Sequence, residues 1–143
     1  MKKIVIFFVI VIAILGVVWY IYEEHKILTS QKIAFNGSYE ELIDKTVNGS
    51  KLASVINESI NRNEKNKVEK DSKNLYTDNG NNSVQIEIKF LDNPNIIKAE
   101  KLYYNDISKF IELYSNSIFE LKTIEYHSKT NLVKYLYFEE VEE

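Results

Sequence analysis

The most restrictive feature of this sequence is an uncharged, apolar run from Ile4 to Tyr22. As an α-helix, a run of this length covers about one bilayer thickness of hydrocarbon, roughly 30 Å. A secretory signal has an apolar region of about 7–15 residues that ends at small residues. Here the run is longer and is followed by acidic side chains. It therefore predicts a retained signal-anchor helix over residues 1–22 rather than a cleaved signal peptide.

The residues that flank the run predict how the helix would sit in a membrane. Lys2 and Lys3 precede it, and Trp19, Tyr20 and Tyr22 lie at its other end. Aromatic side chains gather at the membrane interface, and basic residues favour the cytoplasmic side. We expect these five residues at the membrane interfaces, with the N-terminus cytoplasmic and the remainder of the chain extracytoplasmic.

The remainder of the chain is acidic. The whole chain has 18 basic and 21 acidic side chains, and setting aside Lys2 and Lys3 leaves a formal charge of −5 beyond the apolar run. Because this field does not attract nucleic acid or anionic lipid, no nucleic-acid partner is expected. The chain has no cysteine, which excludes disulfides, thiolate nucleophiles and cysteine-based metal sites.

Helical patterns continue beyond the apolar run. A juxtamembrane helical extension is expected over residues 23–37, where neither glycine nor proline interrupts the pattern before its end. Ser38 opens a capping-box pattern that predicts a short helix over 38–46. Apolar residues at helical spacing behind Ser50, the expected N-cap, predict an amphipathic helix over 51–62.

The second half of the chain alternates as strands do. Strict alternation of apolar and polar residues predicts a strand over 83–90 with one buried face. A second strand is expected over 96–104, and Asp106 is the predicted cap of a helix. Two further β-rich runs, over 119–127 and 132–138, are joined by a connection of hairpin length.

This order of elements predicts an α+β fold. An N-terminal transmembrane helix is followed by a small domain in which helices pack on one face of a largely antiparallel sheet. The extracytoplasmic α+β domain is expected over 38–138, and an acidic tail over 139–143.

Only one pair of side chains suggests chemistry. Glu125 and His127 stand two residues apart on a predicted strand and so would share a face. Such a pair can supply two metal ligands or a base and its orienting group. The alternative is a histidine that closes the strand beside the turn.

The sequence does not match the other catalytic and metal-binding motifs that we considered. A calcium loop starting at Asp78 would need glutamate at its twelfth position, where Lys89 stands. Neither a serine-nucleophile motif nor a glycine-rich phosphate loop is found in the sequence. We therefore predict no catalytic residue, no metal and no cofactor, and do not expect an enzyme.

Tyrosine leaves a second alternative open. Aromatic rows on an exposed sheet face can stack against sugars or peptides, although strands also favour tyrosine for ordinary packing. The tyrosines concerned lie in the second half of the chain: Tyr103, Tyr104, Tyr114, Tyr126, Tyr135 and Tyr137.

The layout of a hydrophobic helix, an amphipathic extension and a small antiparallel sheet resembles that of type IV pilins and pseudopilins. In that family the processing site is a glycine followed by a Phe-type residue, with a glutamate five places after the cut. Here the only glycine of the run is Gly16 and the first acidic residue is Glu23. The resemblance is one of layout, and it implies, as an alternative function, a subunit that assembles through its N-terminal helix.

Two segments are similar to parts of uncharacterised small membrane-anchored proteins of AT-rich Gram-positive bacteria. They are NGSKLASVINESINRN at 48–63 and IEYHSKTNLVKYLYFEE at 124–140. The resemblance implies a place in a bacterial cell envelope and supplies no activity. We therefore expect a non-catalytic, single-pass membrane protein whose domain binds or scaffolds another envelope component. Its partners would be the lipid bilayer and an envelope protein.

Overall fold

The chain forms two compact units, Met1–Ala34 and Phe35–Glu143. The structure is a computed structural model that describes residues 2–142. The side chains of Lys2 and Lys3 fall outside the described part, and so does their predicted interface role.

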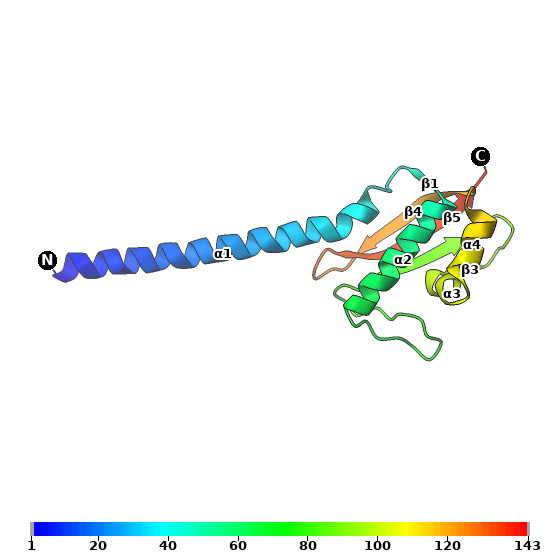
Figure 1. Ribbon diagram of the computed structural model, residues 1–143. Coiled ribbons are helices and arrows are strands. Elements are labelled where there is room, and N and C mark those ends of the chain that lie inside the picture. Colours follow the sequence, from blue (N-terminus) through cyan, green and yellow to red (C-terminus); the bar gives the residue numbers. More distant parts are fainter. Residues whose placement is uncertain (1, 143) are drawn as a thin grey trace. The chain divides into compact units, whose positions relative to one another are not determined.

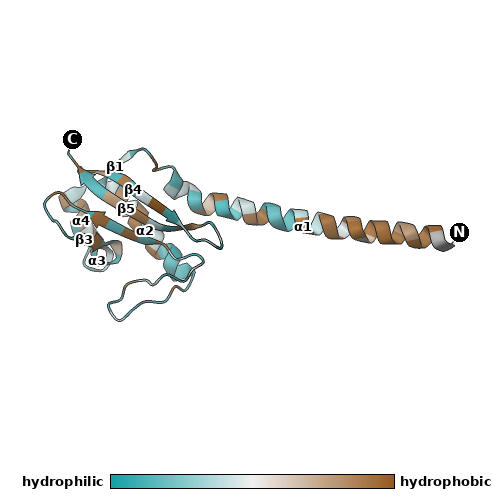
Figure 2. Ribbon diagram, turned by 180° about the vertical axis from the view of Figure 1, so that it is seen from behind, coloured by the Kyte–Doolittle hydropathy of each residue, from teal (hydrophilic) through white to brown (hydrophobic). Residues whose placement is uncertain are grey.

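The first unit belongs to one long helix, α1 (Lys2–Glu40). No side chain from Ile4 to Tyr22 is buried, and Figure 2 shows this part of the helix as strongly apolar. The exposed residues include Trp19 and Tyr20, two of the predicted interface aromatics. The helix is long and apolar enough to cross a membrane. The predicted combination of an N-terminal candidate membrane helix with an α+β domain is therefore confirmed.

The short helix predicted over 38–46 is wrong. α1 continues to Glu40, and the chain then turns into the short strand β1 (Thr46–Asn48). Ser38 does not cap a helix, because its hydroxyl donates to Glu58 Oε1 at 2.9 Å. Asn36 and Gly37, residue types that commonly end a helix, do not end α1, which runs through into the second unit.

The second amphipathic helix, α2 (Gly49–Lys65), is longer than the predicted 51–62. Its N-cap is Asn48, whose side chain accepts from the backbone N–H of Lys51 at 2.8 Å. The predicted cap, Ser50, lies within the first turn. Asparagine and serine are both good N-caps, so spacing alone does not choose between them.

The sheet has five strands in the order β1, β4 (Ile118–Tyr126), β5 (Val133–Val141), β2 (Gln85–Lys89) and β3 (Ile96–Lys98). β4 and β5 form the predicted antiparallel hairpin. β2 pairs with β5 in parallel, and the remaining pairs are antiparallel. The largely antiparallel sheet is therefore confirmed. Glu139 and Glu140, expected in an acidic tail, belong to β5.

The single strand predicted over 96–104 is instead a strand followed by a helix. β3 (Ile96–Lys98) ends the sheet, and α3 (Ala99–Tyr104) begins at the next residue. The sequence Ala-Glu-Lys-Leu at the start of α3 consists of strong helix formers, which outweigh the weak alternation. α4 (Ile107–Tyr114) follows and is capped by Asp106 as predicted, through its bond to Ser108 N at 3.0 Å.

The second unit has two layers, with α2, α3 and α4 on one face of the sheet (Figure 1). The alternation predicted over 83–90 is confirmed by the burial of every second residue. Apolar side chains of α2 meet this face and form one core with those of β4 and β5. Members of this core include Leu52, Ile56, Ile60, Ile86, Ile88, Phe90, Phe119, Leu136 and Phe138.

Gly49 marks a close approach between helices, and it supplies a test of this packing. A Cβ at this position would lie 1.8 Å from the backbone oxygen of Tyr114, at the end of α4. We expect Gly49→Ala to lower the free energy of unfolding by about 3 kcal/mol, because backbone has to move. The measurement is urea unfolding of the full chain in detergent, followed by near-ultraviolet circular dichroism.

Gly37 is the matched control, because a Cβ there meets nothing within 4 Å and the residue lies in α1. Gly37→Ala should raise the free energy of unfolding by about 0.5–1 kcal/mol, since alanine favours helix. Equal stability of Gly49→Ala and the wild type would contradict the close approach of α2 and α4.

Candidate functional site

His127 directly follows β4 and opens the turn to β5. Its ring is 1% exposed, and its Nε2 lies 2.8 Å from the backbone oxygen of Ser83. A carbonyl oxygen only accepts hydrogen bonds, so Nε2 is the protonated nitrogen. The backbone N–H of His127 donates to Leu132 O at 2.9 Å and closes the turn. His127 therefore joins the hairpin to the loop before β2.

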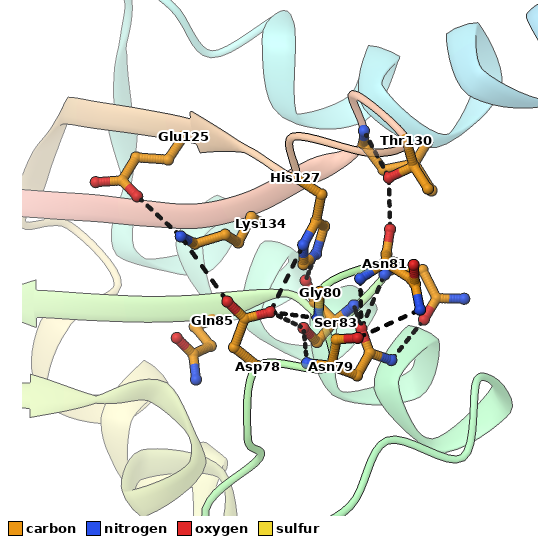
Figure 3. Close-up of polar contacts among 12 residues, drawn as sticks. Asp78, Asn79, Gly80, Asn81, Ser83, Gln85, Glu125, His127, Thr130 and Lys134 are labelled. Carbon is orange, nitrogen blue, oxygen red and sulfur yellow. Dashed lines mark hydrogen bonds and ion pairs between the residues drawn. The ribbon is translucent and has the colours of Figure 1, made fainter.

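Asp78, in that loop, faces both His127 and Lys134 (Figure 3). Its Oδ1 accepts from the backbone N–H of Gly80 at 2.7 Å and lies 3.6 Å from His127 Nδ1. Its Oδ2 lies 3.9 Å from the Lys134 ammonium. The Gly80 hydrogen bond, and then the nearby His127 and Lys134, hold the pKa of Asp78 below its usual range.

Glu125 does not meet His127. It is exposed, and its carboxylate lies 3.4 Å from Lys134 Nζ. The register of β4 against β5 shifts between Glu125 and Tyr126, and such an irregularity cancels the two-residue period on which the predicted pairing depended. The described residues contain no cluster of His, Cys, Asp or Glu that could hold a metal.

The loop from Asp78 to Ser83 satisfies its own polar groups. Asn79 Oδ1 accepts from the backbone N–H groups of Asn81, Asn82 and Ser83 at 3.0–3.1 Å. Such a side chain replaces the backbone partners that a loop lacks. Asp78 Oδ1 and Asn79 Oδ1 are thus engaged in holding the loop.

The tyrosines do not form one row. Tyr103, Tyr104 and Tyr114 lie on α3 and α4, whereas Tyr135 and Tyr137 lie on β5, alternating with its buried residues. These two therefore point to the sheet face opposite the helices, which we call the open sheet face.

Both tyrosines of the open sheet face bind carboxylates. Tyr135 donates to Glu87 Oε2 at 2.9 Å, and Tyr137 donates to Glu139 Oε1 at 2.7 Å. The latter hydrogen bond, with some burial, raises the pKa of Tyr137 to about 12.

Charges on the open sheet face compensate one another. Each of its lysines has a carboxylate within 4.0 Å, in the pairs Lys89–Glu139, Lys98–Glu87, Lys122–Glu120 and Lys134–Glu125. Exposed ion pairs of this kind add little to the free energy of unfolding. Because positive and negative charges are paired on this face, it has no extended region of one charge that would attract a charged ligand.

A groove with a volume of about 630 Å³ lies between β3, α3 and α4. Leu113 and Ile96 are 64% and 53% exposed, which makes part of its surface apolar. We refer to it as the β3–α4 groove. It is lined by Asn95, Ile96, Ile97, Lys101, Leu102, Asn105, Asp106, Lys109, Phe110, Leu113 and Tyr114.

Two basic residues and a strained backbone border the β3–α4 groove. Lys101 and Lys109 are exposed, and neither has a carboxylate oxygen within 4.0 Å in the part of the chain that the structure describes. Asp106, between them in the chain, has φ 108° and ψ 91°. A non-glycine residue in this region is strained, and strain of this kind is often found at functional sites.

Comparison with protein-family models, curated protein sequences and solved structures found no match for this chain. Sequence reasoning missed the β3–α4 groove because it placed 96–104 in one strand. The helix-forming residues Ala99 to Leu102 were the signal that could have revealed it.

The contacts of His127 predict a structural role that mutation can test. We expect His127→Ala to lower the free energy of unfolding by about 2–4 kcal/mol, because it leaves a cavity and a buried carbonyl without its donor. The control, Glu125→Gln, should change it by less than about 0.5 kcal/mol. Both would be measured by urea unfolding. If both variants stayed folded and each lost a metal ion that the wild type binds, the result would instead support a metal site formed by Glu125 and His127.

The lowered pKa of Asp78 predicts that the free energy of unfolding depends on pH. Because the pKa of Asp78 is lower in the folded chain than its ordinary 3.8, the carboxylate stabilises the fold above that value. This contribution disappears as the pH falls through the folded pKa. We expect Asp78→Asn to be less stable than the wild type at pH 7, with the difference narrowing toward pH 3. An equal difference in unfolding free energy at both pH values would contradict it.

Proposed function

We propose that this chain is a single-pass membrane protein of a bacterial cell envelope. In this proposal residues 1–22 anchor it with the N-terminus in the cytoplasm. The α+β domain then lies outside the cytoplasm, where it binds or scaffolds another envelope protein without catalysis.

The observation that supports the anchor most directly is the exposure of the apolar half of α1. No side chain from Ile4 to Tyr22 is buried against another part of the described chain. A large exposed apolar surface is unstable in water and signals contact with lipid or protein. The uncharged length of the run suits lipid, and the basic residues before it favour the proposed orientation.

A binding role, rather than catalysis, agrees with how the described side chains are used. Glu125 and His127 are engaged in separate contacts, with Lys134 and with Ser83. The β3–α4 groove, by contrast, has apolar side chains and lysines without carboxylate partners. The resemblance to small membrane-anchored proteins of Gram-positive bacteria points to the same place in the cell.

Cysteine labelling can test the orientation cleanly because the chain has no cysteine of its own. Lys73 is exposed in the loop before β2, so Lys73→Cys should react with a membrane-impermeant maleimide in intact cells. Ile56 is 0% exposed, so Ile56→Cys is the control and should stay unlabelled unless the domain unfolds. Labelling of Lys73→Cys only after lysis would contradict an extracytoplasmic domain.

The intact mass of the cellular protein separates the proposal from its rivals. We expect the mass of the uncleaved chain, because the run lacks small residues at its end. A mass shortened near Gly16 would favour the pilin-like alternative, in which a leader is removed before assembly. A mass shortened after Tyr22 would indicate a secreted domain.

A further inference from the structure

We propose that the β3–α4 groove binds an extended, acidic segment of a partner protein. The segment pairs with the outer edge of β3 and places apolar side chains in the groove. This inference rests on the proposed binding function and names the kind of partner that the domain recognises.

The backbone of β3 provides the first reason. β3 is the last strand of the sheet and pairs only with β2 among the described strands. Its outer edge is therefore free to accept another strand, a common way to bind an extended peptide. Asn95, Ile96 and Ile97 line the groove, so a peptide paired with this edge would lie along it.

The apolar surface provides the second reason. Leu113 on α4 and Ile96 on β3 are both more than half exposed, and both line the groove with the half-buried Leu102. Alternate side chains of a paired strand point to the same face. Every second side chain of the bound segment would thus turn toward these residues, which favours apolar residues at those positions.

Charge provides the third reason. Lys101 on α3 and Lys109 on α4 line the groove together with one acidic residue, Asp106, so the lining has an excess of positive charge. The lysines of the open sheet face have carboxylate partners, whereas these two have none among the residues described. Complementary charge across an interface selects the partner and speeds association. An acidic segment is therefore the complementary occupant.

The same observations favour a peptide over a membrane surface. A bilayer is flat, whereas the lysines and apolar residues here line a hollow bounded by a strand edge and two helices. A protein segment that enters the groove can use the free edge of β3, the apolar side chains and the two lysines together.

A peptide-binding assay tests the proposal on the full chain. The protein would be held in nanodiscs of neutral phosphatidylcholine. The probe is a fluorescein-labelled ten-residue peptide in which glutamate alternates with leucine and valine, and binding is followed by fluorescence anisotropy. We expect saturable binding that weakens as salt is raised, because charge contributes to it. A peptide with lysine in place of glutamate should not bind.

Charge reversal gives the matched comparison. We expect Lys101→Glu with Lys109→Glu to raise the dissociation constant at least about tenfold, since two attractions become repulsions. Lys45 and Lys129 are also exposed lysines but lie outside the groove. Lys45→Glu with Lys129→Glu makes the same change in net charge and should alter binding less than twofold.

Two further changes separate the apolar and backbone contributions. Leu113→Ser replaces a side chain that is 64% exposed, so the fold should survive while binding weakens at least fivefold. N-methylation of alternate peptide residues removes the N–H groups needed to pair with β3 and should abolish binding. Circular dichroism of each protein variant verifies that it remains folded.

Several results would overturn the proposal. These are absence of binding to the wild type, equal binding by the Lys101 and Lys109 double variant, or unaltered binding of the methylated peptide. Binding of the protein to phosphatidylglycerol vesicles that is lost in the same double variant would assign the groove to lipid. Nanodisc dimers that disappear in Leu113→Ser would assign it to a second copy. The labelling of Lys73→Cys is independent of these results, so the groove can fail while the proposed function stands.

Discussion

Burial of one face of α2 against the sheet is the interaction on which the second unit depends. Leu52, Ile56 and Ile60 repeat at helical spacing and meet the inward residues of the strands, among them Phe119 and Leu136. Each fully buried side chain of this size contributes about 1.5–3 kcal/mol. Because all three helices cover the same face, the opposite face remains polar, and its charged side chains pair with one another. The position of α3 and α4 at the sheet's end also creates the β3–α4 groove.

Three polar side chains connect the helices to the rest of this unit. Asn36 binds the hairpin through Asn131 O and Val133 N, and Asn63 binds both backbone groups of Val84. Arg62, the chain's single arginine, donates to Phe35 O at 2.8 Å. Buried amides are tolerated when their hydrogen bonds are satisfied, and each such bond then specifies one arrangement. Through these contacts Phe35 and Asn36 are joined to the second unit, which begins at Phe35.

The candidate sites show where sequence reasoning reached its limit. Glu125 and His127 were paired on the assumption of unbroken alternation, and a register shift separates them. The partner of His127 is a backbone oxygen that lies 44 residues away in the chain, which no spacing rule identifies. The groove was missed for a different reason. The alternation over 96–98 was extended into residues that form a helix once α3 packs against α2.

Local patterns in the sequence determined the apolar helix, α2, β2 and the hairpin of β4 and β5. Their side chains repeat with the period of the element, and the period follows from backbone geometry alone. Only the tertiary structure decided that β2 runs parallel to β5, that His127 binds the loop before β2, and that Lys101 and Lys109 border one groove. These features join residues distant in sequence. They depend on how the layers pack, and no local period contains that information.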